Sequence, residues 1–246
     1  MDLRDRAVLI TGGKRMGAAI AKLLGDRGAD VALTYNRSRA DVESAIPSVQ
    51  GAGRRAIAVN ADLSDPPQCE RAVSQTVESF GRLDVLVNMA SVYVATEFDA
   101  LTVEAWQRTL DIDLRAAFLC ARAAVPHMRR VGGGRIVNFS DWVARSGRPR
   151  YTGYLPYYVA KHAVVGLTEA LALELAPSNI LVNAIAPGPI LAPEGTDEQA
   201  RLAVERATPL GRWGGAEEIG KVLLAIIDSD FMTGETIRID GGRHVY

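Results

Sequence analysis

The amino-acid sequence predicts an α/β protein built on a seven-stranded parallel sheet with helices on both faces. Three observations support this prediction. Short apolar runs alternate with longer amphipathic stretches along all 246 residues. Most of the short runs are apolar at consecutive positions, which is typical of strands buried on both faces. No linker rich in Pro or Ser divides the chain, so we expect one domain over residues 1–246.

The expected strands follow one another as short apolar runs: Ala7–Thr11, Val31–Tyr35, Ala56–Asn60, Val85–Asn88, Arg135–Ser140, Leu181–Ala186 and Thr236–Asp240. The longer stretches between them predict helices over Gly17–Gly28, Arg39–Gly51, Pro66–Phe80, Val103–Arg130, Pro156–Leu175 and Glu217–Asp228. One helix start is well marked, because Asp65 precedes Pro66 and proline is favoured in the first turn of a helix. Right-handed connections between parallel strands then give a doubly wound, Rossmann-like sheet.

Composition and charge exclude several classes of protein. Lys and Arg total 28 against 29 Asp and Glu, so the formal net charge is −1 and no basic excess favours nucleic-acid binding. Cys69 and Cys120 lie far apart and match no zinc spacing or disulfide framework, so we expect no metal site. The longest apolar stretches have the length of strands, and the first residues resemble no signal segment. We therefore expect a soluble cytoplasmic protein with no membrane partner.

The first expected strand runs into a glycine-containing turn. Gly12, Gly13 and Gly17 follow the strand, and a helix begins at the last of them. Glycine lets the backbone approach a pyrophosphate closely, and a helix N-terminus offers free N–H groups and positive potential. Glycines also end strands for purely steric reasons, but the strand before and the helix after favour dinucleotide binding.

The end of the second expected strand indicates which dinucleotide binds. A carboxylate at this place would accept a hydrogen bond from a ribose 2′-hydroxyl and repel a 2′-phosphate. The sequence here has Arg37 and Ser38, which can donate to a phosphate, and no acid before Asp41. Lys14 and Arg15 in the glycine turn add positive charge. The pattern favours NADP(H) over NAD(H).

Tyr157 and Lys161 form the candidate catalytic pair. Residues four apart project from the same face of a helix, and of Tyr154, Tyr157 and Tyr158 only Tyr157 has a lysine at that spacing. A neighbouring ammonium favours the phenolate and should lower the pKa of Tyr157, so that this phenol becomes an acid or base near neutral pH.

Taken together, these motifs resemble the short-chain dehydrogenase/reductase family, nearly from end to end. The resemblance rests on Thr11-Gly12…Gly17, Ala61-Asp62-Leu63, Asn88-Met89-Ala90, Tyr157…Lys161, Val182-Asn183…Pro187-Gly188 and Thr233-Gly234…Asp240-Gly241-Gly242. It implies that Tyr157 donates a proton and that Lys161 holds the nicotinamide ribose. It further implies contacts to adenine from Asp62 and Leu63, to the length of the cofactor from Asn88 and Ala90, and to the carboxamide from Pro187, Gly188 and Ile190. Family resemblance also implies a homotetramer, or at least a dimer.

Three positions depart from the family pattern. The glycine turn is one residue shorter than usual. Asp113 stands where the family has an asparagine that helps a water relay, and an aspartate can still accept hydrogen bonds. Asp141 stands where the family has its catalytic serine, while Ser140 falls one residue earlier and should point the opposite way along the strand.

An aspartate at position 141 resembles the pteridine and dihydromonapterin reductases, in which aspartate and tyrosine relay protons to the ring. Two runs, Lys14-Arg15-Met16-Gly17 and Tyr35-Asn36-Arg37-Ser38, resemble the 2′-phosphate contacts of that branch. Tyr93, two residues after Ser91, falls where that branch carries an aromatic that stacks on the pterin. Ordinary packing explains Tyr93 equally well.

We therefore expect hydride transfer from NADPH to a pterin-type C=N, with Tyr157 as proton donor and Asp141, Asp113, Ser91 and Tyr93 in the site. A generic carbonyl reductase, acting on a 3-oxoacyl thioester, a sugar ketone or an alcohol, is the alternative. A non-catalytic NADP-binding protein is a third hypothesis. Residues 191–208, with a helix-like stretch inside, are expected to form a substrate lid.

Overall fold

The computed structural model describes residues 1–146 and 151–245, and one parallel sheet organises them. The strand order is β3-β2-β1-β4-β5-β6-β7, and every pairing is parallel, which confirms the expected doubly wound sheet. The order reverses between β1 and β4, and ligands of such sheets bind at the carboxyl ends of the strands around this point. The strands are β1 Ala7–Thr11, β2 Asp30–Tyr35, β3 Ala56–Asn60, β4 Val85–Asn88, β5 Gly134–Phe139, β6 Ile180–Pro187 and β7 Thr236–Ile239.

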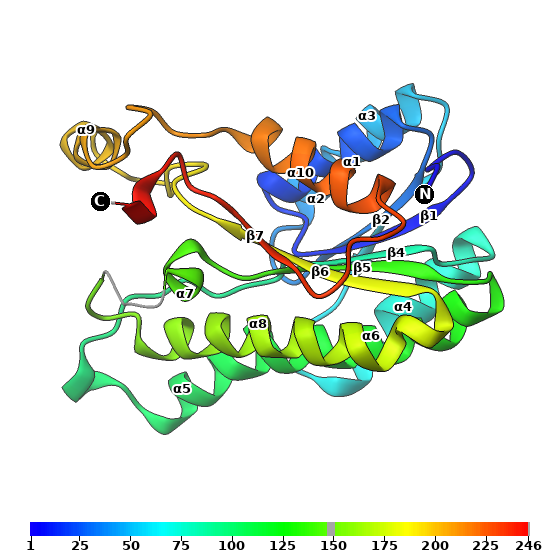
Figure 1. Ribbon diagram of the computed structural model, residues 1–246, viewed down its shortest axis with the longest axis horizontal. Helices are drawn as coiled ribbons and strands as arrows, with labels where there is room; N and C mark the ends of the chain where they lie inside the picture. Colours follow the sequence, from blue (N-terminus) through cyan, green and yellow to red (C-terminus); the bar gives the residue numbers. More distant parts are fainter. Residues whose placement is uncertain (147–150, 246) are drawn as a thin grey trace.

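Helices cover both faces of the sheet (Figure 1). One apolar cluster joins the sheet to α4 (Pro66–Phe80), α6 (Ala116–Arg130) and α8 (Leu155–Leu175). A second cluster joins the other face to four helices: α1 Met16–Asp26, α2 Arg39–Glu43, α3 Ile46–Gly51 and α10 Ala216–Asp228. Since both faces are covered, the strands are apolar at successive positions, and all five residues of β1 are buried.

Two helices expected as single units are interrupted. The stretch Arg39–Gly51 forms α2 and α3, because Pro47 near the start of α3 has no N–H with which to continue a helical hydrogen-bond ladder. The stretch Val103–Arg130 consists of α5 (Val103–Leu110), a π-helical turn over Asp111–Arg115, and α6. A π-turn contains one more residue than an α-turn and often marks a functional site.

The carboxyl edge of the sheet carries two shorter helices. The sequence did not predict α7 (Trp142–Arg145), which directly follows β5 and has Asp141 as its N-cap. The helix expected in the lid is α9 (Glu198–Arg206), capped by the side chain of Asp197. Figure 1 shows that α7, α9 and the C-terminal turn Arg243–Val245 lie at the same end of the molecule.

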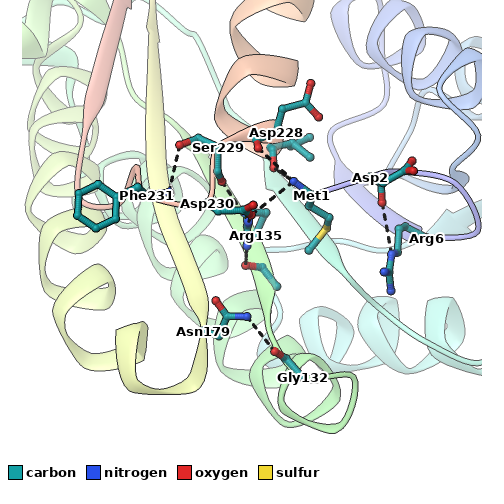
Figure 2. A network of polar contacts seen from close by, with 12 residues as sticks. Met1, Asp2, Arg6, Gly132, Arg135, Asn179, Asp228, Ser229, Asp230 and Phe231 are labelled. Atoms are coloured by element: carbon teal, nitrogen blue, oxygen red, sulfur yellow. Dashed lines mark hydrogen bonds and ion pairs between the residues drawn. The ribbon is translucent and has the colours of Figure 1, made fainter.

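A polar network anchors the opposite edge of the sheet (Figure 2). The amino group of Met1 donates to the carbonyl oxygens of Ile227 and Asp228, at 3.0 and 3.2 Å, where α10 ends. The buried guanidinium of Arg135 donates to Asp230 at 2.6 Å and to the carbonyl of Ser229 at 3.1 Å. The amino-terminal edge is therefore closed by fixed contacts, and the carboxyl edge is left for ligands.

Within the described part of the chain, no helix combines the length and apolar character needed to cross a membrane. The same residues contain no group of three or more His, Cys, Asp or Glu side chains that could hold a metal ion. Cys69 and Cys120 are both buried and free.

Candidate active site

The candidate catalytic residues meet at the carboxyl ends of β4 and β5. Tyr157 and Lys161 come from the first turns of α8, Asp141 follows β5, and Asp113 lies in the π-helical turn. The Tyr157 hydroxyl donates a hydrogen bond of 2.8 Å to Oδ2 of Asp141. The other oxygen of this carboxylate, Oδ1, accepts the Val143 N–H at 2.9 Å. The cap of α7 therefore fixes the carboxylate that binds the phenol.

Ser140 and Asp141 have different partners, as the alternation of a strand predicts. The Ser140 hydroxyl is buried and donates to the backbone carbonyl of Lys161 at 2.8 Å. Ser140 thus ties β5 to α8, and of these two neighbours it is the aspartate that accepts the hydrogen bond from Tyr157.

Lys161 is held by two acceptors inside the protein. Its Nζ donates to the carbonyl oxygen of Phe139 at 2.9 Å and lies 3.1 Å from Oδ1 of Asp113. The side chains of Lys161 and Asp113 are only 4% and 0% exposed, so the two form a buried ion pair. The ammonium also lies 5.4 Å from the centre of the Tyr157 ring.

The carboxylate of Asp113 is itself fixed by neighbours. Ser91 donates its hydroxyl to Oδ1, and the Val92 N–H donates to Oδ2 at 2.9 Å. The π-helical turn buries Ile112 and Asp113 together. Ser91, expected in the substrate site, therefore holds Asp113, which in turn holds Lys161.

Burial and charge act on the two titrating groups of the pair. Burial raises the pKa of Asp141 above its ordinary value, although the Val143 N–H, the Tyr157 hydroxyl and Lys161 oppose the shift. Burial, and then the negative charges of Asp141 and Asp113, raise the pKa of Tyr157 well above its ordinary value. The expectation that Lys161 lowers the pKa of Tyr157 is therefore wrong, because burial and the charges of Asp141 and Asp113 outweigh the effect of the ammonium.

Aromatic rings surround the phenol. The ring of Tyr93 stacks on Tyr154 with centroids 4.4 Å apart, and it meets Tyr157 edge-on at 4.9 Å. Tyr93 remains 49% exposed, so part of its surface is open to solvent. Nothing in the local sequence distinguishes Tyr154 as a site residue beyond its being one of three neighbouring tyrosines.

A groove of about 480 Å³ runs along the carboxyl edge from the glycine turn toward Ser91. A Cβ at Gly12 would lie 2.8 Å from the Cα of Ala90, so only glycine allows the turn to pack against the end of β4. The groove brings together most of the predicted cofactor residues of the first half of the chain: Gly12, Lys14, Arg37, Ser38, Asp62, Leu63 and Ala90. Tyr35 and Asn36, from the run that resembles 2′-phosphate contacts, also line the groove, as does Arg108, which the sequence argument did not single out as a binding residue.

Arg15, Met16, Gly17 and Asn88 do not line this groove. Arg15 adopts a positive φ of 51°, and its guanidinium donates to the carbonyl of Ala192 at 2.6 Å. Gly17 is required by space, because a Cβ there would lie 2.7 Å from the Gly12 carbonyl oxygen. Asn88 is buried, and its amide donates to Asn138 at 3.0 Å, which ties β4 to β5.

The expected lid contacts the glycine turn through Lys14 as well. The ammonium of Lys14 lies 3.0 Å from the carboxylate of Glu194, in the expected lid, and 3.7 Å from that of Asp41. Lys14 and Arg15 therefore fasten the first residues of segment 191–208 to the turn.

Pro187 is the last residue of β6, and Gly188 and Ile190 follow it; β6 lies next to β5 in the sheet, on the side away from β4. The Gly188 N–H donates to the carbonyl of Ile239 at 2.8 Å, and a Cβ at Gly188 would lie 2.5 Å from the Cβ of Asp240. This loop therefore packs directly against the end of β7.

Comparisons with known proteins agree with this architecture. A family model described as enoyl-(acyl carrier protein) reductase matches residues 13–244. The chain is 35% identical to the short-chain reductase protein NovJ of Streptomyces niveus, over 98% of this chain and 94% of the relative. It is 32% identical to a 3-oxoacyl-(acyl-carrier-protein) reductase of Synechocystis, over 98% of this chain and 97% of the relative. A solved short chain dehydrogenase from Burkholderia cenocepacia, in complex with NADP, has a TM-score of 0.91 and 33% identity, with 99% of both chains covered.

Proposed function

Because the chain belongs to the short-chain dehydrogenase/reductase family, we propose that it is an NADPH-dependent reductase in which Tyr157 protonates the substrate. The hydrogen bond between the Tyr157 hydroxyl and Asp141 carries this proposal, because it joins the expected proton donor to a buried carboxylate. Lys161 and Asp113 form a buried ion pair beside the ring of Tyr157.

The residues present fit NADP(H). Because Gly12 has no side chain and packs closely against Ala90, a pyrophosphate could approach the backbone of the glycine turn. Arg37 and Ser38 line the groove and could donate to a 2′-phosphate. Asp62 and Leu63 would contact the adenine, and Pro187, Gly188 and Ile190 the carboxamide. The cofactor supplies a hydride when bound. The complex of the Burkholderia relative with NADP supports the same assignment.

The side chains of this site then donate one proton to the substrate and replace it. The Tyr157 hydroxyl would give its proton to the nitrogen or oxygen next to the reduced carbon of the substrate. The high pKa of Tyr157 keeps that proton on the phenol until the transfer. Asp141, whose pKa is also raised, relays a replacement proton to Tyr157 through their 2.8 Å contact. Lys161 stabilises the phenolate in the interval, since its ammonium lies 5.4 Å from the ring centre.

We propose a pterin-type ring as the substrate. The Asp141 carboxyl has oxygen atoms that can accept from ring N–H groups, and the half-exposed ring of Tyr93 suits a planar heteroaromatic ring. The resemblance to the Synechocystis 3-oxoacyl reductase favours the alternative, a carbonyl substrate carried as a thioester.

One assay separates the two substrates. NADPH oxidation is followed with 7,8-dihydrobiopterin and with an acetoacetyl thioester, for the wild type and for Asp141→Ser. A pterin reductase loses turnover on this substitution, whereas a ketone reductase gains it. Tyr157→Phe is the common control and should lose about 10²-fold or more with either substrate. A wild-type enzyme that reduces only the thioester, and reduces it faster as Asp141→Ser, contradicts the pterin proposal.

The proposal extends to assembly and to the lid. Apolar side chains on α6 and α8 are exposed, with Phe118 at 41%, Val159 at 37% and Leu173 at 79%. A homotetramer, or a dimer, of this single cytoplasmic domain would cover them. Light scattering coupled to gel filtration measures the assembly.

We also propose that residues 191–208 close over the bound substrate. Limited proteolysis with and without cofactor tests this closure.

A further inference from the structure

Arg145 ends α7, and Arg238 and Arg243 contact this helix; none of the three has a carboxylate partner among the described residues. Among residues 1–146 and 151–245, no acidic side chain forms an ion pair with Arg145, Arg238 or Arg243. Arg238 donates to the carbonyl oxygen of Arg145 at 3.3 Å, and its Nε is buried without a hydrogen-bond partner. Buried polar atoms without a partner are rare, so this one points to a ligand that completes the site.

The third guanidinium rests on aromatic rings. The Cζ of Arg243 lies 5.4 Å from the centre of the Trp142 ring and 6.0 Å from the centre of the Tyr151 ring. Such stacking orients a guanidinium and leaves its N–H edge able to bind an anion. Trp142 follows Asp141 directly, so the arginine is tied to the segment that carries the candidate catalytic carboxylate.

The turn that carries Arg243 is rigidly built. The buried carboxylate of Asp240 accepts the Gly242 N–H at 3.0 Å and the His244 N–H at 2.9 Å. The imidazole of His244 also lies 2.7 Å from Asp240. Asp240 is thus occupied by its own turn, and the position of Arg243 is set by the backbone around it.

A line of aromatic rings connects Arg243 to the candidate catalytic phenol. Tyr157 meets Tyr93 at 4.9 Å, Tyr93 stacks on Tyr154 at 4.4 Å, and Tyr154 meets Tyr151 at 6.5 Å, next to Arg243. Figure 1 shows the C-terminal turn at the end of the molecule where α7 and the lid helix α9 lie. A substrate whose reacting atom is at Tyr157 would pass along these rings toward the arginines.

We infer that Arg145, Arg238 and Arg243 form a subsite for an anionic group, a carboxylate or a phosphate, on the substrate. Arg243 is its main contact, and the rings between it and Tyr157 pack against the middle of the substrate. The inference rests on the proposed placement of the reacting atom at Tyr157, and it holds for a C=N or a C=O substrate alike.

Matched substrate pairs test the subsite. The pterin pair is 7,8-dihydrofolate, which has carboxylates on its tail, and neutral 7,8-dihydrobiopterin. The thioester pair is acetoacetyl-coenzyme A, which carries phosphates, and neutral acetoacetyl-N-acetylcysteamine. In Arg243→Gln, kcat/KM for the charged member should fall roughly 10- to 100-fold relative to the neutral one. Arg243→Lys should recover part of this loss. Arg27→Gln, whose arginine pairs with Asp228 at 3.1 Å far from the candidate site, is the control and should change neither ratio.

Binding gives a second readout that needs no turnover. Calorimetric titrations use pyrophosphate for the phosphate arm and citrate for the carboxylate arm, with the protein saturated by NADP⁺ so that cofactor phosphates do not interfere. The wild type should bind at least one of these anions saturably, and Arg243→Gln and Arg238→Gln should weaken that binding about tenfold. Absence of saturable binding to the wild type, or equal charged-to-neutral ratios in wild type and Arg243→Gln, overturns the subsite. Failure with both pterins but not with thioesters overturns the pterin proposal alone.

Discussion

Replacement of Asp113 by alanine should strongly destabilise the protein. Lys161 and Asp113 are 3.1 Å apart, and their side chains are 4% and 0% exposed. The substitution leaves the Lys161 ammonium buried with only the Phe139 carbonyl as a partner. Removal of one member of a buried pair costs about 3–5 kcal/mol. For a chain of this length each kcal/mol lowers Tm by about 2–4 °C, so a fall of roughly 6–20 °C is expected.

Differential scanning calorimetry measures this fall, and the chain contains a matched control. Lys22 and Asp26 form the same kind of pair at 2.6 Å on the surface, with side chains 59% and 47% exposed. Asp26→Ala should cost only about 0–1 kcal/mol, because solvent screens the pair. The double variant Asp113→Leu with Lys161→Met should regain much of the lost stability, since apolar residues of similar size remove both charges. That double variant should have no reductase activity.

Equal melting temperatures for Asp113→Ala and Asp26→Ala would refute the buried ion pair. A double variant no more stable than Asp113→Ala would show that the carboxylate acts through Ser91 and Val92 and not through Lys161.

Three further predictions concern the proton, the cofactor and the lid. Because burial raises the pKa of Asp141, its carboxyl keeps a proton to a higher pH than an exposed aspartate, so the reduction rate should fall as pH rises past that pKa. Rate profiles that begin near the ordinary aspartate pKa of 3.8 and continue to alkaline pH should show the fall in the wild type and no such fall in Asp141→Asn. Arg37→Ala should raise KM for NADPH about tenfold and leave KM for NADH unchanged, because Arg37 lines the groove and can bind the 2′-phosphate that only NADPH carries. The control is Arg39→Ala, whose arginine pairs with Glu43 at 2.8 Å, and it should alter neither value. Glu194→Gln should tighten NADPH binding about two- to fivefold at low salt, because Lys14 then keeps its charge for phosphate, and weaker binding would contradict this.

Local pattern and chirality were enough to predict the sheet. Continuous apolar runs such as Ala7–Thr11 have no amphipathic alternation, and in the structure every residue of that strand is buried. The handedness of parallel connections then restricts the topology. The helix interruptions were not predicted, because apolar spacing continues through Asp111–Arg115 and the π-turn becomes visible only in the backbone hydrogen bonds.

The pairing of Tyr157 with Lys161 could be predicted because both lie on one helix. Contacts between distant segments could not. The hydroxyl of Ser91 reaches Asp113 across 22 positions, and the turn that brings them together is not encoded in local spacing. The pKa direction for Tyr157 was wrong for the same reason, since burial and the position of Asp113 outweigh a lysine four residues away.

The contact between Gly188 and Asp240 has a consequence for the size of the molecule that this enzyme can accept. A side chain at Gly188 would collide with Asp240, so the end of β6 and the turn bearing Arg243 form one inflexible block. In such a block, the distance between the reduced atom of the substrate and the arginines that bind its anionic group is fixed. Lengthening a charged substrate by single methylenes should therefore give a sharp optimum in kcat/KM, and the same series without the charge should show a broad one.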